Sequence, residues 1–287
     1  MDQPRIAMDH SIEIALPARV RLGEGPNWDA AAGVLLWVDI LGNEVHAYDP
    51  ATGADTVRHT AQHVGAARPR AGGGLVVNLR DGVGLYDPDG AFRWLAEHPV
   101  PGCRGNDAAV GPDGAFWAGT MRYDEAPGGG RLRRVRPDGG TTTVLDDVTV
   151  SNGIAWSPDG RLMYYVDTPT RRIDVFDFDP EEGATRRRAF VTVPGQPDGL
   201  TTDADGRVWV ALWGGGRVLC YTPGGGLDRT VEVPAAQTTA CAFGGPDLRD
   251  LYVTTATVGA PKDDPHGGSL FVVPGAGQGL PSPAFAA

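Results

Sequence analysis

A short strand-like segment with an apolar or aromatic centre recurs along this chain of 287 residues. The intervals between successive centres are 39, 41, 47, 45 and 43 residues, and the centres are Trp37, Val76, Trp117, Tyr164, Trp209 and Tyr252. A period of about 40 to 45 residues is typical of one four-stranded antiparallel blade. Six repeats therefore predict an all-β fold, a six-bladed β-propeller whose equivalent positions lie on rings around a central channel.

Turn signals support this interpretation. Asp113-Gly114, Asp159-Gly160 and Asp205-Gly206 each stand directly before one of the apolar segments, as hairpin turns do. The chain also contains 42 glycines and 24 prolines, and no long stretch has a period of 3.6 residues. We expect very little helix.

The repeats run from about residue 20 to the end, which predicts a single propeller domain over residues 11–287 after a flexible N-terminus at residues 1–10. Residues 11–16 alternate apolar and polar side chains, like a half-buried strand. We expect this segment to close the ring by pairing with residues 269–273, because that pairing satisfies an otherwise open sheet edge.

Charge and composition narrow the possible partners and location. The formal net charge of −11 disfavours nucleic acid and anionic membranes as partners. Three cysteines without metal-ligand spacing fit a reducing compartment. Residues 1–10 lack the apolar core of a signal peptide. No run of about 18 apolar residues suggests a transmembrane helix. We expect a cytoplasmic protein, either a monomer or a weak homo-oligomer.

Several kinds of chemistry find no support. Lys262 is the only lysine and lies in a loop-like segment, which disfavours an imine mechanism. No Gly-x-Ser-x-Gly motif marks a serine nucleophile, and no Gly-x-Gly-x-x-Gly motif marks a nucleotide site. The six histidines do not form a helical pair of zinc ligands.

Four polar residues stand at nearly the same point of the repeat. Asn106, Asn152 and Asp198 each precede an Asp-Gly turn by seven residues, and Glu24 precedes Trp37 by thirteen. In a propeller, side chains at equivalent positions meet around the channel even though they are far apart in sequence. We therefore expect two carboxylates and two carboxamides at one mouth of the channel.

The oxygen atoms of Glu24, Asn152 and Asp198 suit one divalent cation at the centre of the fold. Ca²⁺, Zn²⁺, Mn²⁺, Mg²⁺ and Fe²⁺ all remain open, and three protein ligands leave room for water and substrate. The alternative is that Asn152-Gly153 and Asp198-Gly199 are ordinary turns. We prefer the cation site because each blade already has a hairpin turn seven residues later.

Arg104 precedes Asn106 by two residues and adds a cation to the predicted ring. A guanidinium and a carboxamide together can bind the hydroxyl or carbonyl oxygens of a polar ligand, and sugars are natural candidates. The alternative is that Arg104 only caps backbone carbonyls of its own loop.

These motifs resemble those of the senescence marker protein, gluconolactonase and luciferin-regenerating enzyme family. The segments that carry the resemblance are residues 22–26, 36–40, 104–107, 118–121, 151–153, 164–167, 197–200, 214–218, 243–245 and 251–254. The resemblance implies a six-bladed propeller, metal ligands Glu24, Asn152 and Asp198, substrate contacts Arg104 and Asn106, and an acid-base role for Asp198. Family members often have a glutamate a few residues beyond Thr120-Met121 that contacts substrate, and here Asp124 stands at that offset.

The leading hypothesis is therefore metal-dependent hydrolysis of a sugar lactone, gluconolactone-like, to its aldonic acid. A metal-dependent esterase or phosphotriesterase could use the same site, because a polarised oxygen suits those substrates as well. A non-enzymatic calcium-binding propeller is the remaining alternative, since many propellers are scaffolds.

Overall fold

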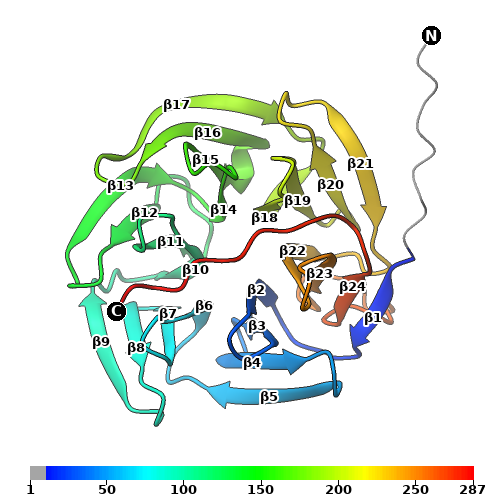
Figure 1. Cartoon of the computed structure of the whole chain (residues 1–287), viewed down its shortest axis with the longest axis horizontal. Coiled ribbons are helices and arrows are strands. Elements are labelled where there is room, and N and C mark those ends of the chain that lie inside the picture. Colours follow the sequence, from blue (N-terminus) through cyan, green and yellow to red (C-terminus); the bar gives the residue numbers. More distant parts are fainter. Residues whose placement is uncertain (1–10) are drawn as a thin grey trace.

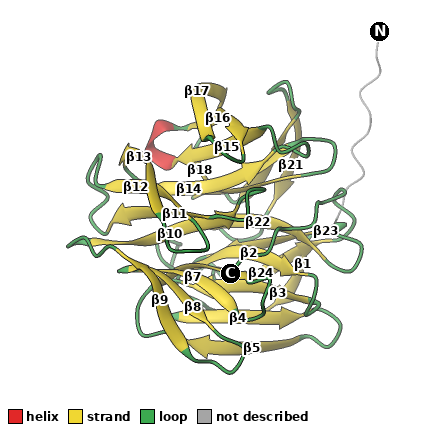
Figure 2. Cartoon of the chain, turned by 60° about the vertical axis from the view of Figure 1, so that its left-hand side comes forward, coloured by secondary structure: helices red, strands yellow, loops and turns green. Residues whose placement is uncertain are grey.

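The computed structural model describes residues 11–287, so the expected flexible segment at residues 1–10 lies outside the described part. Six four-stranded antiparallel sheets stand radially around a centre (Figure 1). The predicted all-β, six-bladed propeller is confirmed. Figure 2 shows the same ring turned by 60°, built of strands and loops with one short helical turn.

The sheets follow one another along the chain, each running from an inner strand to an outer one. Blade 1 consists of β2 (Gly23–Asp29), β3 (Val34–Asp39), β4 (Glu44–Asp49) and β5 (Ala54–His59). Blade 2 consists of β6 (Val64–Pro69), β7 (Leu75–Leu79), β8 (Gly82–Tyr86) and β9 (Phe92–Glu97). Blade 3 consists of β10 (Cys103–Val110), β11 (Phe116–Arg122), β12 (Gly130–Val135) and β13 (Thr141–Val148).

The second half of the ring repeats this order. Blade 4 consists of β14 (Ser151–Trp156), β15 (Leu162–Asp167), β16 (Arg172–Asp179) and β17 (Gly183–Thr192). Blade 5 consists of β18 (Gln196–Thr202), β19 (Val208–Trp213), β20 (Arg217–Tyr221) and β21 (Leu227–Glu232). Blade 6 consists of β22 (Thr238–Gly244), β23 (Asp250–Thr255), β24 (Leu270–Val273) and β1 (Glu13–Leu16).

The apolar centres found in the sequence occupy the second strand of every blade. Trp37, Trp117 and Trp209 are among the largest fully buried side chains. The repeat exists because each blade must bury the same strand between its two neighbours. The only helix among residues 11–287 is the 3-10 turn Thr168–Thr170, so the expectation of very little helix is also confirmed.

The predicted ring closure is confirmed. β1 pairs antiparallel with β24, with Glu13 opposite Val272 and Ile14 opposite Phe271. A strand from the beginning of the described chain thus supplies the outer strand of the last blade, and the edge of β24 is covered. Within residues 11–287, no helix is long and apolar enough to cross a membrane.

The three Asp-Gly pairs form the predicted hairpin turns. Gly114, Gly160 and Gly206 have φ angles of 71°, 67° and 77°, which a side chain would make costly. They connect the first and second strands of blades 3, 4 and 5.

A C-terminal tail after β24 forms a strap across one face of the ring (Figure 1). Gly279 forms a bridge with Asp203, Phe285 forms one with Arg70, and the backbone nitrogen of Ala286 donates to the oxygen of Gly114. The strap therefore ties blade 5 to blades 2 and 3. Its anchor is Phe285, which is fully buried in the core between blades 2 and 3.

We expect the Phe285→Ala substitution to lower the free energy of unfolding by about 3 to 5 kcal/mol, because it leaves a cavity where the ring packs edge-on against Phe116. Urea unfolding of the full chain measures this change. Leu227→Ala is the matched control, since Leu227 is exposed, and it should change the value by no more than about 0.5 kcal/mol. Equal effects of the two substitutions would show that the strap does not hold the ring.

Candidate active site

The innermost strand of every blade has a bulge at the same level. In blades 1, 3, 4 and 5 the pairing register shifts between Glu24 and Asn27, Gly105 and Ala108, Ser151 and Ile154, and Pro197 and Leu200. Each shift places one extra residue in the inner strand, and such bulges redirect side chains. Glu24, Asn106, Asn152 and Asp198 all lie within or beside these bulges.

The glycines that follow two of these residues are not turn residues. A Cβ atom on Gly153 would lie 2.8 Å from the backbone oxygen of Asp198, and one on Gly199 would lie 2.8 Å from Cα of Ala240. Each glycine lets the inner strand of the next blade approach closely. The turn interpretation of Asn152-Gly153 and Asp198-Gly199 is therefore wrong.

The structure brings the four polar side chains into one cavity of about 480 Å³ at one mouth of the channel, and all four are nearly buried. Arg104 also lines this cavity. Residues from blades 1, 3, 4 and 5 thus meet around the channel axis, as the repeat predicts.

A chain of hydrogen bonds fixes the carboxamides. Arg104 Nη1 donates to Asn106 Oδ1 at 2.6 Å, and Asn106 Nδ2 donates to Asn152 Oδ1 at 2.7 Å. Asn152 Nδ2 donates to Thr168 Oγ1 at 2.8 Å, and that hydroxyl donates to the backbone oxygen of Pro197. The carboxamide oxygen of Asn152 keeps a second lone pair for a ligand.

The two carboxylates have few partners of their own. Among residues 11–287, Asp198 Oδ1 is buried without a hydrogen-bond partner, and Glu24 Oε2 accepts the backbone N–H of Gly25 at 3.1 Å. Burial raises the pKa of Glu24 to about 8, and the negative charge of Asp107 adds to this effect. Burial also raises the pKa of Asp198 well above its usual range, and the negative charge of Glu24 adds to this effect. Two such carboxylates are costly unless a cation accompanies them.

These residues fit a divalent cation. Glu24 and Asp198 supply hard carboxylate oxygens, and Asn152 supplies a neutral one. Over residues 11–287 no group of three or more His, Cys, Asp or Glu side chains is arranged to hold a metal. The candidate set differs from such a group because its third donor is a carboxamide.

The rim of the cavity departs from the sequence expectation at Asp124. Arg122 Nε donates to Asp124 Oδ1 at 2.7 Å, and this hydrogen bond is the main cause that lowers the pKa of Asp124 to about 2. Asp124 is exposed and does not line the cavity, whereas its neighbour Glu125 does. The substrate contact expected at Asp124 stays a prediction; in the structure the adjacent Arg122 binds its carboxylate.

Aromatic side chains form other parts of the rim. Tyr123 lines the cavity, and its hydroxyl lies 2.7 Å from Nδ1 of His63 on blade 2. Trp213 of blade 5 also lines it. Thr168 and Glu125 are site residues that sequence reasoning missed, because both belong to loops between strands rather than to the repeated motif.

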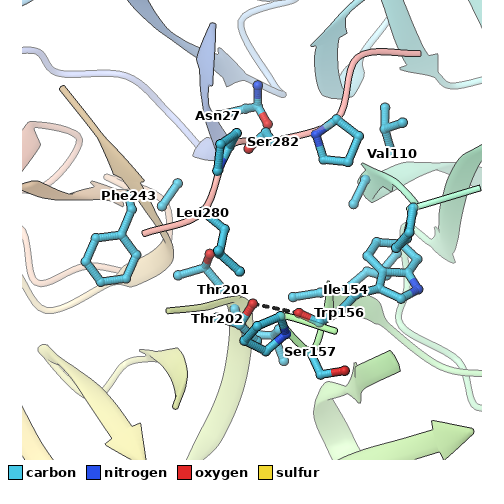
Figure 3. Close-up of a pocket in the computed structure, with 18 of the residues that line it drawn as sticks. Asn27, Val110, Ile154, Trp156, Ser157, Thr201, Thr202, Phe243, Leu280 and Ser282 are labelled. Atoms are coloured by element: carbon cyan, nitrogen blue, oxygen red, sulfur yellow. Dashed lines mark hydrogen bonds between the residues drawn. The ribbon is translucent and has the colours of Figure 1, made fainter. Parts of the chain in front are cut away.

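A second cavity of about 490 Å³ lies at the other ends of the innermost strands, where the C-terminal strap forms part of its wall (Figure 3). Asn27, Ile154, Thr201, Phe243 and Leu280 line it. Neither Glu24 nor Asp198 does. The two buried carboxylates therefore assign the candidate active site to the first cavity.

Comparisons with known proteins agree on one family. The model of the SMP-30/Gluconolactonase/LRE-like region matches residues 22–257. A pentonolactonase of Haloferax volcanii is 41% identical over 82% of this chain and 82% of its own length. A 6-deoxy-6-sulfogluconolactonase of Pseudomonas putida is 36% identical, over 92% of this chain and 95% of its own length.

A solved structure agrees in fold over nearly the whole chain. It is the crystal structure of a calcium-binding protein, regucalcin, from Agrobacterium tumefaciens. The TM-score is 0.93 at 32% identity, and the match covers 97% of this chain and 98% of that one.

Proposed function

This chain belongs to the SMP-30/gluconolactonase/LRE-like family, and on that premise we propose that it hydrolyses a sugar lactone to the aldonic acid with the help of one divalent cation. The observation that carries the proposal is the buried, unpartnered Oδ1 of Asp198 in a cavity that Glu24 and Asn152 also line. The lactonase names of two relatives support the reaction class.

Glu24, Asn152 and Asp198 would hold the cation. When bound, a divalent cation supplies Lewis-acid polarisation of a carbonyl oxygen. Its identity stays open, although the description of the similar regucalcin structure as calcium-binding makes Ca²⁺ the first ion to test.

The other residues position the substrate and move protons. Arg104 is buried, and its hydrogen bond to Asn106 fixes the guanidinium where it can donate to the oxygens of a lactone. Asp198 accepts a proton from the attacking water and returns it to the ring oxygen that leaves.

The test is the hydrolysis of a panel of aldonolactones by metal-stripped and metal-restored protein, after subtraction of spontaneous ring opening. We expect turnover only with the cation present. A carboxylic ester and a phosphotriester belong in the panel, because turnover of these alone would replace the lactonase proposal with one of the alternatives. Tight Ca²⁺ binding without turnover of any substrate would instead favour a binding role.

At the rim we propose that Glu125, rather than Asp124, contacts the substrate hydroxyls. Glu125→Gln should raise KM for the preferred lactone by about tenfold, because a neutral acceptor replaces the charged one in a hydrogen bond to a substrate hydroxyl. Asp124→Asn is the matched control, because that carboxylate pairs with Arg122 in solvent, and it should leave KM unchanged. Steady-state kinetics of the two variants decide which of the two residues contacts the substrate. A raised KM in Asp124→Asn with an unchanged KM in Glu125→Gln would assign the contact to Asp124.

A further inference from the structure

Blade 2 contributes no side chain to the ring of polar residues. Its inner strand carries Gly65 at the bulge, where a Cβ atom would lie 2.2 Å from the backbone oxygen of Asn106. Any side chain at this position is excluded by the neighbouring blade. Blade 2 instead directs Arg68, three residues further along β6, toward the inner strands on both sides.

The Arg68 guanidinium connects blades 1 and 3. Its Nη1 donates to the backbone oxygen of Gly25 at 2.8 Å, and its Nη2 lies 3.6 Å from Asp107 Oδ1. Gly25 directly follows Glu24, and Asp107 directly follows Asn106. Arg68 therefore lies beneath the gap that Gly65 leaves in the ring, next to the backbone of two ring residues.

Arg68 and Asp107 are both almost inaccessible to water, with side-chain exposures of 7% and 9%. Arg68 lines the cavity at the opposite mouth but not the candidate active site. The pair thus belongs to the partition between the two cavities. At such burial, water screens the charges weakly, so an unbalanced charge would act strongly on the nearby site.

Asp107 directly follows Asn106 in the bulge of β10, at the level of the polar ring. Its negative charge contributes to raising the pKa of Glu24 and that of Asp198. Without Arg68, Asp107 would add an unbalanced negative charge near the two proposed carboxylate ligands. With Arg68 present, Asp107 and its partner are neutral as a unit.

We propose that Arg68 and Asp107 form a charge-balancing pair, so that the partition adds no net charge to the cation site lined by Glu24, Asp198 and Arg104. Both are positioning residues that act through the site and do not touch the substrate. The inference rests on the proposed cation site.

The experiment is calorimetric titration of the metal-stripped full chain with Ca²⁺ alone, and separately with Mn²⁺, at one fixed pH. Asp107→Asn leaves an unbalanced buried cation, so the Kd should rise by at least about tenfold. Arg68→Met leaves an unbalanced anion, so the Kd should fall. The double variant should return to within about threefold of the parent, because the partition is neutral again.

Opposite effects of the two single substitutions, with recovery in the double variant, support charge balance. If both weaken binding and the double variant is no better than either, the pair has only a structural role and the inference is overturned. If a single variant does not fold, the double variant decides alone: a Kd near that of the parent supports the inference, and one more than tenfold weaker overturns it.

Glu24→Gln separates this inference from the proposed function. Cation binding that is lost in Glu24→Gln but unchanged in Asp107→Asn rejects the charge-balancing pair and leaves the proposed function standing. A parent chain that binds neither ion at any accessible concentration rejects both.

Discussion

Replacing Asp198 by alanine should reduce lactone turnover by at least about a thousandfold. The substitution removes the proposed general base, which by itself contributes about a hundredfold to ten-thousandfold, and also one of two charged cation ligands. Because both roles are lost together, added cation should not restore the rate. The measurement is kcat at saturating lactone and cation.

The loss should be functional rather than structural. The carboxylate of Asp198 is buried and one of its oxygens has no partner, so its removal should not lower the melting temperature of the metal-stripped chain. Asp205→Ala is the matched control on the same blade, because Asp205 is an exposed hairpin residue seven positions later, and it should retain parental turnover. An Asp198→Ala variant with full cation-dependent activity would refute the assignment.

The second large effect is expected at Glu24. Glu24→Gln keeps the size of the side chain but removes one of two charges facing the cation, so it should abolish stabilisation by the cation. At a cation concentration about 100 times Kd, the parent should gain about 2.7 kcal/mol from binding to the folded state alone. Urea unfolding with and without Ca²⁺ measures this gain. A Glu24→Gln variant that keeps the whole gain would place the cation elsewhere.

The same residue predicts a pH dependence of the metal-stripped chain. Burial raises the pKa of Glu24 from 4.5 to about 8, so the folded state holds a proton that the unfolded chain releases. The folded state binds more protons in this range, and the free energy of unfolding therefore falls as pH rises from about 4.5 to about 8. Asp198 acts in the same direction. Glu24→Gln should reduce this slope, and saturating cation should reduce it as well.

Much of the fold and of the site could be predicted because the propeller repeats itself. Trp37, Trp117 and Trp209 recur since every blade buries the same strand in the same way. Equivalent positions then become neighbours around the channel, which is why Glu24 and Asp198 could be assigned to one cavity from their places in the repeat.

The tertiary structure decided the contacts between segments that follow no repeat. Thr168 enters the site from a single 3-10 turn, and Phe285 holds a strap that the period does not require. Arg122 binds Asp124 outside the cavity and leaves Glu125 at its rim, a competition between adjacent side chains that sequence spacing does not reveal.

The sequence by itself thus determined the number of blades, the closing strand at residues 11–16 and the ring of Glu24, Asn106, Asn152 and Asp198. These features repeat or complete a repeat, and a periodic burial pattern can be recognised from the order of apolar and polar residues alone. The Arg68–Asp107 pair and the place of Glu125 at the cavity rim were decided only by the folded molecule. Their energies depend on distances between particular atoms of different blades or neighbouring side chains, and those distances exist only after the ring has closed.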